Sequence, residues 1–292
     1  MKTPWVYGII TRMKKVICIV LIFVLIFAVC AVSFGCKGKI KAGDDYRLYQ
    51  YDARTDKFVR MGATLKFGKG FSTFEYTFGD GDLTIYGGVE QTKDPDTFII
   101  SCGEEAVALV TERYRQSMVD NGATQNQLDA FDAISATLTP KSQYFYYDGR
   151  LFTGDAVEMF RVAEDNSDAF EGLYRMDSSS DIVRVRGGFI YAEDDNGEYT
   201  KKTGRYTISR GMMTIVSLDD EGKDRYQNGV LMRKRYFMAK ITLPSDGTLL
   251  GTTMEEQMKS SAFVSKINTD ISDYSGKTIA VLCDSFLSNG LK

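Results

Sequence analysis

Pairs of turn-forming residues recur along the chain and divide most of it into short segments. The pairs are Asp80-Gly81, Asp148-Gly149, Asn196-Gly197, Asn228-Gly229 and Asp246-Gly247. Such pairs accept the positive φ angles that tight hairpin turns require. Between them, residues 182–186 alternate apolar and basic side chains, and residues 237–243 alternate two faces in the same way. This pattern predicts antiparallel strands with one buried face each.

Helices are predicted in one main place, within residues 104–136. Ser101 and Glu104 have the spacing of a capping box, and an apolar stripe follows at helical spacing. The stripe consists of Val107, Val110, Tyr114 and Met118. Because such stripes usually pack against a core, we expect this one to be buried.

A second helix is expected to start at Thr124, which has Gln127 three residues later, and to stop before Pro140. A weaker third signal begins with Thr253 and Glu256. The predicted fold class is therefore α+β and β-dominated. It would contain antiparallel meanders or barrel-like sheets with two or three helices, after one N-terminal apolar helix.

The expected organisation has three parts. Residues 1–36 form a separate N-terminal segment with an apolar run, and residues 37–165 form a β-rich module with a helical insertion near 104–136. Residues 166–292 form a second β-rich module.

Two hairpin patterns suggest a duplication of these modules. Tyr76-Thr77-Phe78 precedes Leu83-Thr84-Ile85, and Tyr206-Thr207-Ile208 precedes Met213-Thr214-Ile215 in the same way. Matching patches in matching order favour related modules. The alternative is that hairpins built from tyrosine, threonine and isoleucine look alike by chance.

An apolar segment near the N-terminus indicates export. Val16 to Phe34 is 19 residues of almost unbroken apolar character, and Lys2, Arg12, Lys14 and Lys15 precede it. A basic start before an apolar stretch is the charge layout of an export signal or a signal anchor. The run is apolar on every face, which argues against an ordinary buried helix.

From Met13 onward this segment resembles the signal of bacterial lipoproteins, in which a small residue precedes a lipidated cysteine. Gly35 and Cys36 match that site, so the resemblance implies lipidation of Cys36. An uncleaved transmembrane helix is the second interpretation, because about 20 apolar residues span a bilayer. Free secretion is the third. The first two attach the remainder to the cell membrane and place it outside the cytoplasm.

The second half of the chain resembles the β-meanders of lipocalin-like domains in bacterial lipoproteins. Gly172-Leu173-Tyr174 matches an opening strand, and the segment from Gly204 to Ile208 matches a later Gly-x-Tyr-Thr-Ile strand. Membership would imply a β-barrel that binds a small apolar ligand.

Charge and histidine content exclude several functions. Residues 1–35 carry four of the 36 Lys and Arg and none of the 39 Asp and Glu, so the remainder has a net charge of −7. An acidic surface disfavours nucleic acid as a partner. The chain has no histidine, which removes Ser-His and Cys-His nucleophiles and His-ligated zinc.

Two cysteines remain after Cys36, and each ends a short apolar run. In an oxidising compartment Cys102 and Cys283 are candidates for a disulfide. Two buried free thiols are the favoured interpretation, because each cysteine ends an apolar run.

No catalytic, cofactor-binding or metal-binding residue stands out. Ser275-Gly276-Lys277-Thr278 lacks the earlier glycine of a phosphate-binding loop. The acidic segment 193–198 does not match an EF-hand loop and is interpreted as a solvated turn. Arg233-Lys234-Arg235 is interpreted as a solvated strand edge.

We therefore expect a membrane-anchored extracytoplasmic protein with a binding or structural role and no catalysis. Its partners would be the membrane and either a small apolar ligand or an envelope protein. The alternative from another class is a carboxylate-dependent hydrolase acting on envelope polysaccharide. A purely structural protein is the third possibility.

Overall fold

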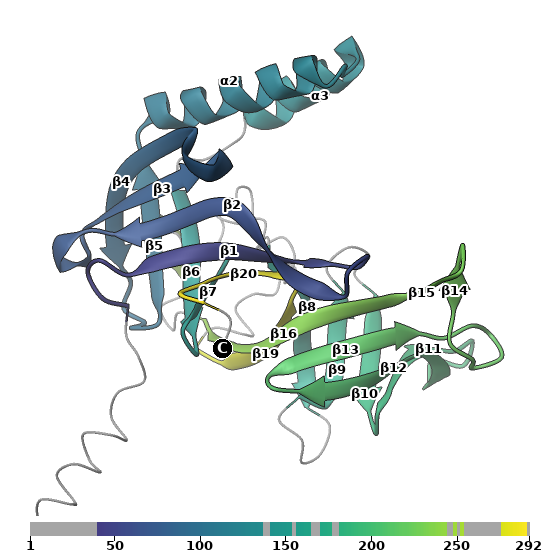
Figure 1. Ribbon diagram of the computed structural model, residues 1–292. Coiled ribbons are helices and arrows are strands. Elements are labelled where there is room, and N and C mark those ends of the chain that lie inside the picture. Colours follow the sequence, from purple (N-terminus) through teal and green to yellow (C-terminus); the bar gives the residue numbers. More distant parts are fainter. Residues whose placement is uncertain are drawn as a thin grey trace, which may run out of the picture. The chain divides into compact units, whose positions relative to one another are not determined.

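Two closed antiparallel barrels of eight strands each make up most of the described chain (Figure 1). The computed structural model describes residues 40–136, 141–153, 156–164, 170–176, 181–243, 248–249, 252–253 and 276–290. Both barrels belong to one unit, Ile40–Lys292. The predicted β-dominated fold with antiparallel, barrel-like sheets is confirmed. The expected N-terminal apolar helix lies outside the described residues.

The first barrel takes seven strands from the beginning of the described chain and one from its end. In spatial order they are β1 (Asp45–Asp52), β2 (Lys57–Phe67), β3 (Thr73–Phe78), β4 (Leu83–Gln91), β5 (Thr97–Cys102), β6 (Lys141–Tyr147), β7 (Arg150–Thr153) and β20 (Ser285–Ser288). The 3₁₀ turns η1 (Lys69–Phe71) and η2 (Gly79–Gly81) flank β3. Strand β20 pairs with both β7 and β1 and closes the barrel.

The second barrel lies between β7 and β20 in the sequence. Its strands in chain order are β8 (Val157–Glu164), β9 (Gly172–Met176), β10 (Ile182–Arg186), β11 (Phe189–Glu193), β12 (Tyr199–Ser209), β13 (Met212–Ser217), β16 (Arg233–Thr242) and β19 (Thr278–Cys283). Pairing of β19 with β8 closes it. A single residue, Asp284, then separates β19 from β20 of the first barrel. The division into modules 37–165 and 166–292 stays a prediction.

Two short ribbons form separate two-stranded sheets: β14 (Tyr226–Gln227) with β15 (Val230–Leu231), and β17 (Thr248–Leu249) with β18 (Thr252–Thr253). The weak helix signal after Thr253 falls outside the described residues.

Hairpin turns form where the turn pairs predicted them. Asp148 and Gly149, with φ of 46° and 78°, join β6 to β7. Asn228 and Gly229, with φ of 52° and 76°, join β14 to β15. These angles match the tight turns that such pairs favour. Asp246-Gly247 lies outside the described residues.

The helical insertion consists of α2 (Glu104–Asp120) and α3 (Gln125–Ser135), which contact each other (Figure 1). The predicted cap of α3 is confirmed, because Oε1 of Gln127 accepts hydrogen bonds from the Thr124 backbone N–H at 2.8 Å and from its hydroxyl at 3.0 Å. The predicted capping box of α2 is wrong, because Gly103 is the N-cap residue and no side chain caps the helix.

The burial predicted for the α2 stripe is also wrong. No residue of α2 is buried, and Tyr114 is 54% exposed. The helix contacts α3 and β4. Its ion pair with α3, between Arg115 and Asp132 at 2.9 Å, lies at the surface. The contacts of α2 with α3 and β4 therefore leave its apolar stripe incompletely buried.

The two hairpins of the suggested duplication have the same register. Tyr76 pairs with Ile85 and Thr77 with Thr84 across β3 and β4. Tyr206 pairs with Ile215, and Thr207 with Thr214, across β12 and β13. The duplication itself stays a prediction.

Aromatic side chains from both barrels share one hydrophobic cluster. Phe152 and Phe286 from the first barrel stack or tilt against Phe237 from the second, at centroid distances of 5.6 and 5.3 Å. The Arg150 guanidinium lies 3.9 Å from the centre of the Phe237 ring. Aromatic contacts and cation–π pairs of this kind add to the gain from apolar burial. Each barrel also has its own core cluster inside.

Candidate functional site

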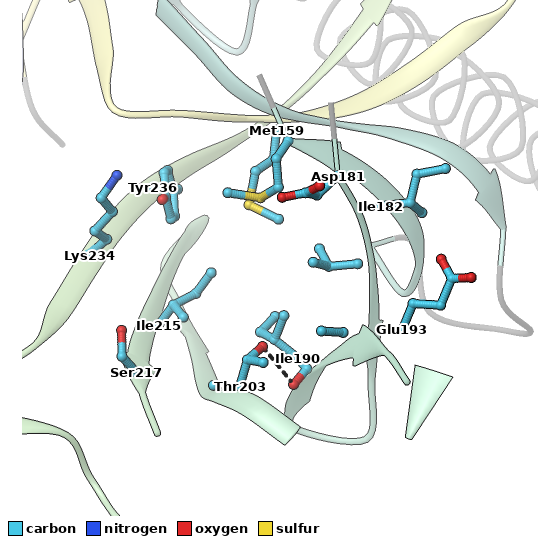
Figure 2. A pocket seen from close by; sticks show the side chains of 14 residues that line it. Met159, Asp181, Ile182, Ile190, Glu193, Thr203, Ile215, Ser217, Lys234 and Tyr236 are labelled. Atoms are coloured by element: carbon cyan, nitrogen blue, oxygen red, sulfur yellow. Dashed lines mark hydrogen bonds between the residues drawn. The ribbon is translucent and has the colours of Figure 1, made fainter. Parts of the chain in front are cut away.

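A cavity of about 490 Å³ opens into the second barrel (Figure 2). Its apolar wall comes from β8 to β13 and consists of Met159, Met176, Ile182, Val183, Ile190, Ala192 and Ile215. Met159, Ile190 and Tyr236 belong also to the buried core of this barrel. The cavity therefore borders the core of this barrel.

Strand alternation and one glycine explain the wall. Tyr206 and Ile215 are cross-strand partners, so their side chains lie on the same face of the sheet, which is the inner one. Gly204 pairs with Ser217 on that face. A Cβ at Gly204 would lie 3.2 Å from Cγ2 of Ile215 and 3.4 Å from Cγ1 of Ile190. The absence of a side chain there lets these two wall residues approach each other.

Polar side chains complete the lining. They are Asp181, Glu193, Thr203, Ser217, Lys234 and Tyr236. The Thr203 hydroxyl donates to the Ile190 carbonyl oxygen at 3.4 Å (Figure 2). Figure 2 shows the Asp181 carboxylate next to Met159, on the cavity side. The cavity thus combines an apolar wall with a few polar groups, which is the usual composition of a small-ligand site.

Lys234 connects the lining to a pair of carboxylates. Its Nζ lies 3.6 Å from Oε2 of Glu158. Burial is the largest cause that raises the pKa of Glu158 above its ordinary value; Lys234 opposes the shift, and the charge and hydrogen bond of Asp284 add to it. Burial, with Glu158 and Asp284 adding, also raises the pKa of Tyr236 far above its usual range. The Tyr236 hydroxyl therefore stays protonated in any physiological medium.

The basic segment Arg233-Lys234-Arg235 has a structural role that the sequence did not indicate. Arg233 and Arg235 form ion pairs with Asp56 of the first barrel, at 3.4 and 3.1 Å. The Tyr51 hydroxyl donates to Asp56 at 3.2 Å. Burial, with Asp56 adding, raises the pKa of Tyr51 to about 12. The interpretation of 233–235 as a solvated edge is therefore wrong for the two arginines, since both are half-buried.

The residues singled out from the sequence do not meet at this cavity. Cys36 lies outside the described residues. Cys102 ends β5, is half-buried and packs against the first-barrel core, and burial raises the pKa of its thiol. Cys283 ends β19 and is buried in the cluster shared by the barrels. Their pairing stays a prediction.

The acidic segment 193–198 forms a turn held by Asp194. Oδ1 of Asp194 accepts hydrogen bonds from the backbone N–H groups of Asn196 and Glu198, at 2.9 and 3.0 Å.

Across the part of the chain that the structure describes, no three His, Cys, Asp or Glu side chains gather as they would around a metal ion. Neither described helix has the length and apolar character to cross a bilayer.

Comparison with protein-family models, with curated proteins and with solved structures gave no match.

The wall residues of the cavity were missed because each is an ordinary apolar strand residue. Met159 and Ile215 are 56 positions apart, and only barrel closure brings both to one cavity. One signal was available in β16. Lys234, Tyr236 and Met238 alternate with Arg233 and Arg235, so two faces with different roles were visible in the sequence.

Proposed function

We propose that this protein is a membrane-anchored, extracytoplasmic binding protein that holds a small apolar ligand in its second barrel and has no catalytic activity. The observation that carries the proposal is the cavity of about 490 Å³ inside a closed barrel. Ligand sites are typically clefts of about 300–1,000 Å³ with mostly apolar walls. Eight-stranded barrels are just large enough to hold one small ligand.

The anchor and location are supported by the N-terminal segment. The run from Val16 to Phe34, with four basic residues before it and Gly35-Cys36 after it, favours a lipid on Cys36 or an apolar helix as the attachment. Either attachment leaves the two barrels outside the cytoplasm. The resemblance to lipocalin-like meanders of bacterial lipoproteins agrees with both the location and the ligand.

Filling the cavity with a large side chain tests whether the ligand binds there. The full-length protein in lipid nanodiscs is titrated with the neutral fluorescent probe N-phenyl-1-naphthylamine. Ile215→Trp places a large ring in the cavity and is expected to remove the saturable fluorescence increase. Val230→Trp is the matched control, because Val230 is 58% exposed in the β14–β15 ribbon and does not line the cavity. Equal binding by both variants would rule out the cavity as the site.

Native mass spectrometry of the same preparation, before any probe is added, identifies what the cavity holds. An apolar molecule that leaves as a discrete mass on denaturation, and is absent from the Ile215→Trp protein, supports the proposal.

The attachment is tested by Cys36→Ser. Loss of membrane retention, with loss of the lipid mass, is expected for a lipid anchor. Unchanged retention would assign the attachment to the apolar helix.

A further inference from the structure

We propose that the ligand of the cavity is an uncharged apolar molecule whose carbonyl oxygen accepts a hydrogen bond from the Tyr236 hydroxyl. This inference rests on the proposed function, because it names the ligand class of the same cavity. It is carried by a buried tyrosine that lines the cavity and whose hydroxyl has no hydrogen-bond partner among the described residues.

Strand register turns Tyr236 toward the inside of the second barrel. Tyr236 in β16 is the cross-strand partner of Met213 in β13. Met213 is buried in the core of this barrel, so the face of β16 that carries Tyr236 is the inner one. Lys234, two residues earlier in β16, has the same orientation, and Figure 2 shows it on the same side of the cavity as Tyr236. The tyrosine is thus part of the cavity wall.

The Tyr236 side chain is buried and its hydroxyl forms no hydrogen bond. Only 2% of the residue is exposed. Within the described part of the chain, the hydroxyl is affected by burial and by the charges of Glu158, Asp284 and Tyr51, and by no hydrogen bond. Buried polar groups in proteins are almost always hydrogen-bonded. A buried exception in the wall of a cavity points to a partner that binds in the cavity.

The protonation state makes this hydroxyl a donor. Burial raises the pKa of Tyr236 far above its usual range, and the carboxyl groups of Glu158 and Asp284 add to the rise. The hydroxyl therefore keeps its proton and can donate one hydrogen bond. A buried donor without an acceptor costs free energy, because it has lost the hydrogen bond that it makes in water. An acceptor oxygen on the ligand removes that cost.

The rest of the lining defines the rest of the ligand. Met159, Ile190 and Ile215 give the cavity an apolar wall, against which hydrocarbon binds favourably. A charged head group would lose its hydration there. Lys234, the basic group of the lining, already has Glu158 as a partner at 3.6 Å. A carbonyl oxygen accepts a hydrogen bond and adds no donor that would need a partner of its own. An apolar ketone, ester or quinone therefore fits these surfaces.

The test compares two probes that share one carbon skeleton. 1-Acetylnaphthalene and 1-ethylnaphthalene each displace N-phenyl-1-naphthylamine from the full-length protein in nanodiscs, and both are measured again on Tyr236→Phe. Partition into lipid is the same for the two proteins and cancels when their affinities are compared. We expect the substitution to weaken binding of the ketone about tenfold and to leave binding of the hydrocarbon unchanged.

Infrared spectroscopy checks the contact itself. The carbonyl stretching frequency of 1-acetylnaphthalene falls when its oxygen accepts a hydrogen bond. After subtraction of the Ile215→Trp spectrum, the parent protein should show this lowered band and Tyr236→Phe should not. Tyr191→Phe is the matched control and should keep the band, since Tyr191 lies in β11 of the same barrel and does not line the cavity.

The same variant tests the unpartnered hydroxyl without a probe. Removing a hydroxyl that has no hydrogen bond should leave the midpoint of urea denaturation unchanged or raised. A lowered midpoint for Tyr236→Phe would mean that the hydroxyl bonds to the protein itself, and would overturn the inference.

The outcomes separate the inference from the function on which it rests. A loss of affinity confined to the ketone, together with loss of the lowered carbonyl band, supports the inference. An equal effect of Tyr236→Phe on both probes overturns it and leaves the small-ligand function standing. No displacement above the Ile215→Trp background by either probe overturns both.

Discussion

The two barrels have the same number of strands and differently filled interiors. In the first, Phe98 stacks on Tyr144 at 5.6 Å and meets Phe67 edge-on at 5.4 Å, so aromatic rings pack its core. In the second, methionine, isoleucine and valine line a cavity of about 490 Å³. Strand number fixes the width of a barrel. The size of the inward side chains then decides whether that width is filled or left for a ligand.

The barrels differ also in what lies beside them. The α2 helix contacts β4 of the first barrel, and its Tyr114 lies close enough to Tyr76 to affect that side chain. Burial, with Tyr114 adding, raises the pKa of Tyr76 to about 12. The cavity of the second barrel is instead lined by apolar, polar and charged side chains. A helix therefore packs beside the first barrel, whereas the second barrel contains strands that line a cavity.

The strongest test of this contrast is a pair of truncations. Phe98→Ala, in the filled barrel, should lower the free energy of unfolding by about 3–5 kcal/mol, because Phe98 is 1% exposed and its removal creates a new void. Ile215→Ala should cost only about 1–2 kcal/mol, since its side chain already borders empty space. Urea denaturation followed by circular dichroism measures both. Equal losses would mean that the two interiors are packed alike.

Breaking the ion pairs between the two barrels should lower the free energy of unfolding by a smaller amount. Asp56→Ala leaves Arg233 and Arg235 without their carboxylate, and we expect a loss of about 1–3 kcal/mol because all three side chains are half-buried. In the control, Asp220→Ala breaks the exposed pair with Lys201, which should cost less than about 0.5 kcal/mol. Separate unfolding transitions for the two barrels in the Asp56 variant would show that this contact couples them. An unfolding free energy equal to that of the control variant would contradict the expectation.

Glu158 should make stability fall as pH rises. Its pKa is raised in the folded protein, so the folded state binds the proton more tightly than the unfolded state. The resulting stabilisation is complete below the ordinary value of 4.5 and is lost as pH rises through the folded pKa. Glu158→Gln cannot titrate, so its stability relative to the parent should rise across that window. Urea denaturation from pH 4 to pH 8 measures the difference, and a constant difference would refute the assignment.

The smallest effect is expected in the helical insertion. Gln127→Ala removes both hydrogen bonds to Thr124 and should cost about 0.5 kcal/mol, with faster amide exchange confined to α3. Gln116→Ala, which removes a side-chain contact with Asp120 within α2, is the control and should leave α3 unchanged. Faster exchange in the first-barrel strands would show that the helices stabilise that barrel, contrary to the shallow packing of α2.

The sequence predicted those parts of the fold that depend on a few neighbouring residues. The turns at Asp148-Gly149 and Asn228-Gly229, and the cap of α3 at Thr124, follow from local backbone preferences. The capping box at Ser101 failed because β5 continues to Cys102, so Ser101 belongs to a strand. Pairing in a sheet competes with local capping, and here it prevails.

The candidate site could not be predicted because it depends on distant partners. Nothing near β20 in the sequence indicates that it pairs with β1, more than 230 residues earlier. In the same way, the space between Met159 and Ile215 follows from the closure of a barrel and not from either residue.

The one-residue link at Asp284, between β19 and β20, affects the order in which the two barrels close during synthesis. Every strand of the second barrel is synthesised before β20, which alone joins β7 to β1 in the first. Until those four residues leave the ribosome, the first barrel has two unpaired edges, and open edges are where chains aggregate. The first barrel to be made is thus the last to close, and premature termination after Cys283 would leave a complete second barrel attached to an open sheet.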